Sequence, residues 1–197
     1  MVHYVLVFVD WDSARRIYRP HSPKKPTRTI ELVFEKLYRV VEEHLNALYK
    51  HKTYRVRWRI YHGWHTGKTK TQDRNDFESF ISDMKATCIK NVSFGNDFQF
   101  GNELMCLSKR NVLYDTLRSQ YGKIFVQKMV DTSLTCDLLH CVRHNESNIN
   151  IIIADDDDVF PAAVTAEAWG SNVSILTRRE NINRHLCTTG LVYSMGD

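Results

Sequence analysis

Residues 149–154 read Ile-Asn-Ile-Ile-Ile-Ala and are followed directly by four aspartates, Asp155 to Asp158. A short apolar run of this kind is typical of a buried strand in a parallel sheet. Sites of parallel α/β proteins form at the carboxyl ends of such strands. Carboxylates crowded in a partly dry cleft repel one another unless a cation lies between them or their pKa values rise. The segment therefore predicts a divalent-metal site, and an acidic turn that caps the next helix is the alternative.

The length and composition fit one domain. The 197 residues are enough to bury a hydrophobic core, and we find no internal repeat or second domain in residues 1–197. There is no apolar stretch of membrane-spanning length and no secretory signal at the amino terminus, so we expect a soluble, cytoplasmic protein without membrane contact. The five cysteines are scattered and form no CxxC pair, which argues against a disulfide framework and a thiolate zinc site.

Charge is distributed unevenly along the chain. Residues 11–74 contain sixteen Lys or Arg against six Asp or Glu, whereas the rest contains eleven against seventeen. A basic part joined to an acidic part suits an enzyme that holds a polyanion on one surface and a metal on another. Ordinary solvation by long basic side chains is the alternative.

Strand-like and helix-like segments alternate along the chain. The predicted strands are 4–9, 54–61, 92–94, 123–126, 149–154 and 172–176. The predicted helices are 30–48, with Thr29 as cap, 76–84, 107–120, 132–142 and 159–169. Residues 11–28 are predicted as a basic loop, 95–101 as a hairpin and 62–122 as an enlarged middle region. This βαβ rhythm predicts a single-domain, three-layer α/β sandwich with a mostly parallel sheet.

The main acidic residues follow predicted strands. Asp10 ends the first strand, Asp131 follows the strand at 123–126, and Asp156 and Asp158 follow the strand at 149–154. A parallel sheet can bring these positions together in one crevice at its carboxyl edge. Asp137 lies about 240° around a helix from Asp131, so it is a secondary acidic candidate.

Four segments resemble a known family. Residues 128–137, K-M-V-D-T-S-L-T-C-D, resemble the K-x-V-D-x-x-L-x-x-D segment of the NYN domain family, a branch of the PIN-like nucleases. Residues 154–161 are similar to its S-G-D-S-D-F-x-P segment, with Asp155 in place of a small residue. Residues 5–13 resemble its opening strand, with Asp12 in place of a small residue and Ser13 in place of asparagine. Residues 166–173 resemble the helix-glycine-strand stretch that follows, and the middle third does not match.

The resemblance implies a PIN-like fold and metal-dependent phosphodiester hydrolysis, most of all of single-stranded RNA. Asp10, Asp131, Asp156 and Asp158 would then be both the catalytic residues and the ligands of Mg²⁺ or Mn²⁺, which prefer oxygen donors. The metal would lower the pKa of a bound water and offset charge on the scissile phosphate. Asp12 joins Asp137 as a secondary acidic residue.

Substrate contacts are expected from the basic part of the chain and from Lys128, for which holding a carboxylate in place is the alternative role. The candidate substrate-binding residues are Ser13, Arg15, Arg16, Lys24, Lys25 and Lys128. Aromatic faces on which unpaired bases could stack are Trp11, Tyr18, Trp64 and His65. Trp58 is predicted in the core, with Arg55, Arg57 and Arg59 on the exposed face of the same strand. Residues 62–70 are predicted as a mobile basic loop.

Two other functions stay open. Asp10-Trp-Asp12-Ser also resembles the D-x-D opening of haloacid dehalogenase-type phosphatases, although that family does not explain Asp131. A PIN-like domain can instead serve as a nucleic-acid or protein binding module without catalysis. The sequence predicts neither the oligomeric state nor a choice between an endonuclease and an exonuclease.

Overall fold

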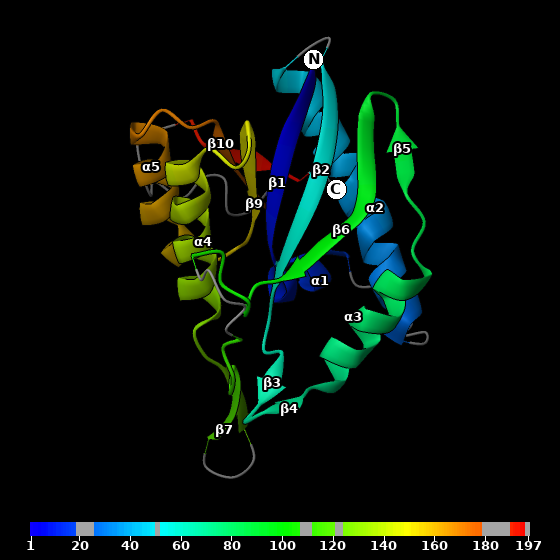
Figure 1. Ribbon diagram of the computed structural model, residues 1–197, viewed down its shortest axis with the longest axis vertical. Coiled ribbons are helices and arrows are strands. Elements are labelled where there is room, and N and C mark those ends of the chain that lie inside the picture. Colours follow the sequence, from blue (N-terminus) through cyan, green and yellow to red (C-terminus); the bar gives the residue numbers. More distant parts are fainter. Residues whose placement is uncertain (19–25, 50–51, 107–111, 121–123, 179–189, 196–197) are drawn as a thin grey trace.

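The computed structural model describes residues 1–18, 26–49, 52–106, 112–120, 124–178 and 190–195. Their centre is a seven-stranded sheet with the order β11-β10-β9-β1-β2-β6-β5 (Figure 1). The strands are β1 (Val2–Asp10), β2 (Thr53–Tyr61), β5 (Thr87–Ile89), β6 (Val92–Phe100), β9 (Ile149–Ile153), β10 (Val173–Thr177) and β11 (Val192–Ser194). Every pairing is parallel except that of β5 with β6, so the prediction of a mostly parallel α/β sheet is confirmed.

Helices cover both faces of this sheet (Figure 1). One face carries α1 (Trp11–Tyr18), α2 (Pro26–Leu48) and α3 (Gln72–Asp83), and the other carries α4 (Val130–His144), the 3-10 turn η1 (Asp157–Val159) and α5 (Phe160–Ala168). In β1, Val5, Val7 and Val9 enter the core under α1–α3, whereas Leu6 and Phe8 enter the core under α4 and α5. A strand buried on both faces needs apolar residues at successive positions, which explains the uninterrupted run of β1.

Helix α2 illustrates how the sequence pattern directs packing. Val33, Phe34, Leu37 and Val41 recur at helical spacing and are buried, and each contributes roughly 1.5–3 kcal/mol of burial free energy. The helix begins at Pro26, not after a Thr29 cap as predicted, because proline is well suited to a first helical turn. Although α2 has 23 residues, no helix in the described ranges is both long and apolar enough to cross a membrane.

Two small antiparallel hairpins lie beyond the carboxyl edge of the central strands (Figure 1). One pairs β3 (His65–Thr66) with β4 (Thr69–Lys70), where a loop was predicted; the other pairs β7 (Leu117–Gln120) with β8 (Ile124–Gln127). The predicted helix at 107–120 is therefore wrong at β7, while residues 107–111 lie outside the described residues. The strand predicted at 123–126 is present as β8, but it pairs with β7 and does not join the main sheet.

The basic loop predicted at 11–28 is wrong over its first part, which forms α1. Trp11 and Ala14 are buried in the core under α1–α3, so packing holds this segment as a helix. Residues 19–25 lie outside the described residues. The hairpin predicted at 95–101 is also wrong, because β6 continues to Phe100. Gly101 then passes so close to Tyr61 that an added Cβ would lie 2.0 Å from its ring, which requires glycine.

Candidate functional site

The carboxyl edge of the sheet gathers three acidic segments. β1 and β9 are parallel neighbours in which Val9 lies opposite Ile153, so Asp10 and the segment from Ala154 leave the sheet side by side. Asp131 lies in the first turn of α4, which packs against β1 and η1. The fold thus brings Asp10, Asp131 and the aspartate run to one edge.

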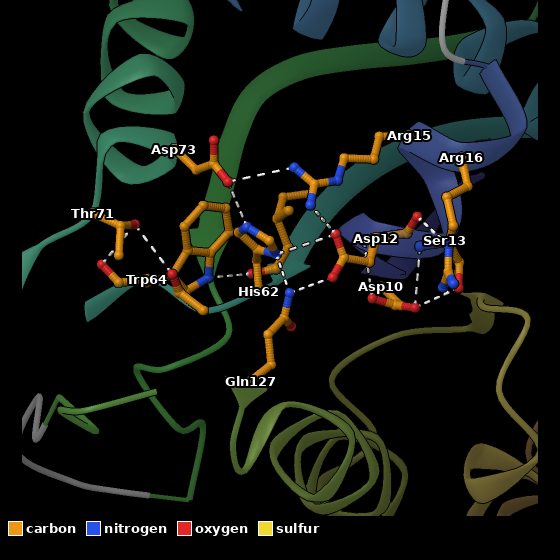
Figure 2. Close-up of polar contacts among 12 residues, drawn as sticks. Asp10, Asp12, Ser13, Arg15, Arg16, His62, Trp64, Thr71, Asp73 and Gln127 are labelled. Atoms are coloured by element: carbon orange, nitrogen blue, oxygen red, sulfur yellow. Dashed lines mark hydrogen bonds and ion pairs between the residues drawn. The ribbon is translucent and has the colours of Figure 1, made fainter. Parts of the chain in front are cut away.

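Asp10 ends β1 with only 7% of its surface exposed. Its carboxylate accepts hydrogen bonds from the backbone N–H groups of Asp12 (3.1 Å) and Ser13 (3.2 Å), and from the Ser13 hydroxyl (Figure 2). These backbone donors are the ones that a helix N-cap satisfies, so Asp10 also caps α1. Burial raises the pKa of Asp10 above its ordinary value, and the hydrogen bond from Ser13 opposes that rise.

Asp131 shows directly that the carboxylates influence one another. Its pKa is raised from 3.8 to about 6, mainly by burial and in addition by the negative charges of Asp10, Asp156 and Asp158. Coulomb repulsion acts over a few ångströms in a partly buried site, so these four carboxylates share one electrostatic environment. The acidic cluster is defined here as Asp10, Asp131, Asp156 and Asp158.

The four consecutive aspartates have different roles. Asp156 accepts a hydrogen bond from the backbone N–H of Asp158 at 3.0 Å and so caps η1, while both side chains are exposed. Asp155 points elsewhere, because its carboxylate accepts hydrogen bonds from the hydroxyl of Thr177 (2.9 Å) and the backbone N–H of Arg178 (3.1 Å). Capping and membership of the acidic cluster are therefore compatible, since a cap occupies only part of a carboxylate's accepting capacity.

The ion pairs of the described residues do not include the acidic cluster. In the described part of the chain, none of its four carboxylates forms an ion pair with a Lys, Arg or His side chain. Several carboxylate oxygens are the donors that Mg²⁺ and Mn²⁺ prefer. Within the described residues, no three His, Cys, Asp or Glu side chains are arranged to hold one ion as they stand. The chemistry of the donors fits a hard cation, and binding one requires side chains of the acidic cluster to change conformation.

A chain of polar side chains runs beside the acidic cluster from α3 to α1 (Figure 2). The amide nitrogen of Gln127 donates to Asp12 and to Nδ1 of His62, the latter at 2.7 Å. Because an amide nitrogen only donates, Nε2 of His62 carries the proton and donates it to Asp73 at 2.6 Å. That hydrogen bond lowers the pKa of Asp73. Sequence reasoning missed His62, Asp73 and Gln127; the one available signal is that His62 directly follows β2, the neighbour of β1.

Arg15 forms an ion pair with Asp12. Arg15 lies 2.5 Å from the carboxylate of Asp12 and 3.5 Å from that of Asp73, and Arg16 donates to the backbone oxygen of Asp12 at 2.9 Å. Asp12 therefore differs from the members of the acidic cluster, because it is paired. Arg16 is exposed, whereas Arg15 is only partly exposed.

The other predicted substrate-binding residues fall in different places. Ser13 is fully buried, and its hydroxyl donates to Asp10 while it accepts from the backbone N–H of Asp155 at 3.0 Å, so it joins two segments of the site. Lys128 is exposed just before α4. Lys24 and Lys25 lie outside the described residues.

Asp137, the secondary acidic candidate on α4, is fully buried away from the cluster. Its carboxylate lies 2.5 Å from Arg59 and accepts hydrogen bonds from the Tyr61 hydroxyl and the Met105 backbone N–H, both at 2.8 Å. The prediction that Arg59 lies on an exposed face is wrong, because α4 packs over this side of β2. Asp137 is a partner of the core and not a member of the acidic cluster.

The predicted base-stacking aromatics are mostly inside the protein. Trp11, Trp64 and His65 are all buried, so these three predictions are wrong, and nothing is described of the side chain of Tyr18. Trp11 packs edge-on against Phe77 in the core under α1–α3, which explains its burial. The core placement of Trp58 is confirmed.

Among the described residues, this edge of the sheet is distinguished by carboxylates without a cationic partner. Asp12 and Asp137 each pair with an arginine, whereas Asp131 experiences the negative charges of Asp10, Asp156 and Asp158. A comparison with protein-family models gave no match to this chain, and a comparison with curated proteins gave none either. Function is therefore inferred from the chemistry of these side chains.

Proposed function

We propose that this protein is a metal-dependent nuclease that hydrolyses phosphodiester bonds, with single-stranded RNA as its preferred substrate. One observation carries the proposal: four carboxylates from three chain segments share one edge, and in the described residues none is paired with a cation. Such a cluster repels a phosphodiester until a cation binds. Mg²⁺ or Mn²⁺ would neutralise the phosphate and lower the pKa of an attacking water.

The four proposed metal ligands are of two kinds, fixed and adjustable. Asp10 is held by the first turn of α1 and by Ser13, and Asp131 is fixed by the first turn of α4. Asp156 and Asp158 are exposed on the short turn η1, so their side chains can turn toward an ion. Fixed ligands set the position of the cation, and adjustable ligands allow it to enter.

The proposed family is the NYN branch of the PIN-like nucleases. The order of the acidic segments along the chain supports it, as does a mostly parallel sheet with helices on both faces. A phosphatase of the haloacid dehalogenase type is disfavoured. Both oxygens of Asp10, which would be its nucleophile, already accept hydrogen bonds, and the residue is buried.

A binding module without catalysis is the second candidate. It is favoured by the finding that, among the described residues, no three potential ligands are arranged to hold a metal ion as they stand. In such a module the acidic cluster would contact basic groups of a partner instead of a metal. The two candidates differ in cleavage and not in fold.

The decisive experiment is a cleavage assay with end-labelled single-stranded RNA, single-stranded DNA and duplex RNA in Mg²⁺, Mn²⁺ or EDTA. Wild-type protein is compared with Asp156→Asn and with Asp83→Asn, which changes an exposed aspartate at the end of α3 outside the cluster. We expect metal-dependent cleavage of single-stranded RNA by the wild type and Asp83→Asn, and a loss of at least about a hundredfold in Asp156→Asn.

Two results would contradict this proposal. Cleavage that survives in Asp156→Asn would place the chemistry elsewhere or in a contaminant. Metal-independent RNA binding without cleavage by the wild type would identify the protein as a binding module.

A further inference from the structure

The two small hairpins form one unit beside the acidic cluster. The backbone N–H of His65 donates to the hydroxyl of Thr116 at 3.0 Å, and that of Asp115 donates to the oxygen of Gly67 at 2.9 Å. We call the described residues of β3, β4, β7 and β8 the double hairpin. It extends from the carboxyl edge of the sheet, the same edge that carries the acidic cluster (Figure 1).

Gln127 shows which face of β8 is turned toward the site. Its side chain contacts Asp12, which follows β1 in α1, and His62, which directly follows β2 (Figure 2). Phe125 precedes Gln127 by two residues, and alternate residues of a strand share a face, so Phe125 lies on the same side about 7 Å farther along. Its side chain is 62% exposed, although phenylalanine is usually buried. An apolar ring is thus presented to solvent on the side that faces the site.

Exposed cations lie on segments next to the strand that carries this ring. Lys128 follows Gln127, and Lys68 lies in the turn between β3 and β4; both are exposed, and neither has an ion-pair partner among the described residues. Arg118 on β7 is also exposed, but it pairs with Asp115 and lies opposite Val126, on the other face of the hairpin from Phe125, so it is not counted among these cations. A polyanion that approaches the acidic cluster needs such cations nearby, because the cluster itself repels it.

We propose that the double hairpin binds single-stranded nucleic acid, with Phe125 stacking on an unpaired base and Lys128 and Lys68 contacting phosphates. The identity of the polyanion rests on the proposed nuclease function. A single strand fits better than a duplex because a ring can stack only on a base whose face is free. Phe125 thereby takes the role that the sequence assigned to Trp11, Trp64 and His65.

Binding is measured by fluorescence anisotropy with a labelled single-stranded RNA and with the same strand in a duplex. The parent protein carries Asp156→Asn so that the RNA stays intact, and it is compared with added Phe125→Leu, Phe125→Trp and Trp169→Leu. Leucine keeps an apolar side chain without a π-face, tryptophan keeps the π-face, and Trp169 is a 55% exposed aromatic residue next to the amino end of β10. Both positions are exposed, so folding is little affected by these substitutions.

We expect Phe125→Leu to weaken single-strand binding by about tenfold, the effect of one lost stacking contact. Phe125→Trp and Trp169→Leu should stay within about twofold of the parent, and duplex binding should not respond to Phe125. Lys128→Gln should lower the slope of log affinity against log salt by about 0.7, the value for one phosphate contact on a single strand.

The proposal is overturned if the parent binds no oligonucleotide, if Phe125→Leu binds the single strand like the parent, or if leucine and tryptophan weaken binding equally. The cleavage assay tests the nuclease proposal independently of the binding assay. Cleavage by the wild type with no response to Phe125 would reject the double hairpin and keep the nuclease. Binding that depends on Phe125 without cleavage would keep the double hairpin and reject the nuclease.

Discussion

Helix α4 carries two aspartates that lie only six residues apart and stand in opposite electrostatic settings. Asp137 faces Arg59, Tyr61 and a backbone N–H, all of which stabilise its negative charge. The negative charges of Asp10, Asp156 and Asp158 disfavour the charged form of Asp131. A carboxylate paired with its own cation stabilises the fold, whereas repulsion among carboxylates is what the proposed metal would relieve.

The charges next to Asp131 and Asp137 shift the pKa values of these two residues in opposite directions. Burial raises the pKa of both carboxyls, because low polarity disfavours the charged form. At Asp137 the neighbouring Arg59 acts against that rise, and at Asp131 the neighbouring charges add to it. The acidic cluster is the candidate for ligand binding because the groups next to Asp131 are negatively charged, and not because of burial alone.

The largest expected effect comes from breaking the compensated pair. Arg59→Met leaves the carboxylate of Asp137 buried without its cation, so we expect the free energy of unfolding to fall by about 3–5 kcal/mol. Urea-induced unfolding followed by tryptophan fluorescence measures this loss. The double variant Arg59→Met/Asp137→Leu should regain much of it, because no charge is then buried. A loss below about 1 kcal/mol in the single variant would show that the pair is not a stabilising feature.

The next effect comes from adding the proposed metal ion. Mn²⁺ at about one hundred times its dissociation constant should raise the free energy of unfolding by about 2.7 kcal/mol if it binds only the folded state. Thermal unfolding with and without Mn²⁺ is compared for wild type, Asp156→Asn and Asp83→Asn. Only Asp156→Asn should lose the shift. An equal shift in all three proteins would mean that Mn²⁺ binds outside the acidic cluster.

The sequence predicts one of these regions better than the other. The carboxyl edge could be predicted because β9 is a short run that is apolar except for Asn150 and ends at Ile153, and a parallel sheet places such ends together. The burial of Arg59 could not be predicted. The alternation in β2 shows that the strand has two faces, but it does not show that α4 covers the face that carries Arg59. The sequence alone suggests an exposed basic strand where the structure has a buried ion pair.

The polar chain around His62 was also beyond sequence reasoning. His62, Asp73 and Gln127 come from three segments that meet only through tertiary packing. Residues 117–120 were assigned to a helix because a short apolar pattern is ambiguous without the partner strand β8. Phe125 likewise was predicted inside a strand of the sheet, and the separate hairpin is what exposes it.

A smaller expected effect concerns the hydrogen bonds that hold the segments of the acidic cluster together. Ser13→Ala removes the hydroxyl that donates to Asp10 and accepts from the backbone N–H of Asp155, so we expect a loss of about 1–2 kcal/mol. The pKa of Asp10 should rise further, because the Ser13 hydrogen bond lowers it. Ser93→Ala, at an exposed position of β6, is the control and should change stability by less than about 0.5 kcal/mol. Equal effects of the two substitutions would show that Ser13 does not link these segments.

The smallest effect has the most informative sign. Asp131 has a folded pKa of about 6, above its ordinary 3.8, so the metal-free protein loses stability as pH rises from about 4 to about 6. Two pKa units correspond to about 3 kcal/mol, and solvent screening of this partly exposed group reduces the effect to about 1 kcal/mol. Asp131→Asn should therefore be more stable than wild type at pH 7.5 in EDTA, and the gain should vanish near pH 4.

Differential scanning calorimetry across this pH range, with Asp137→Asn as the matched control on the same helix, checks the prediction. Asp137→Asn weakens an ion pair and should destabilise the protein in EDTA and in Mn²⁺ alike. The effect of Asp131→Asn on stability should change sign between EDTA and Mn²⁺. In saturating Mn²⁺ the wild type is stabilised by the bound ion, and asparagine is a weaker ligand for that ion than aspartate. Destabilisation by Asp131→Asn in EDTA at pH 7.5 would mean that Asp131 is compensated as Asp137 is, and the contrast between the two regions would be lost.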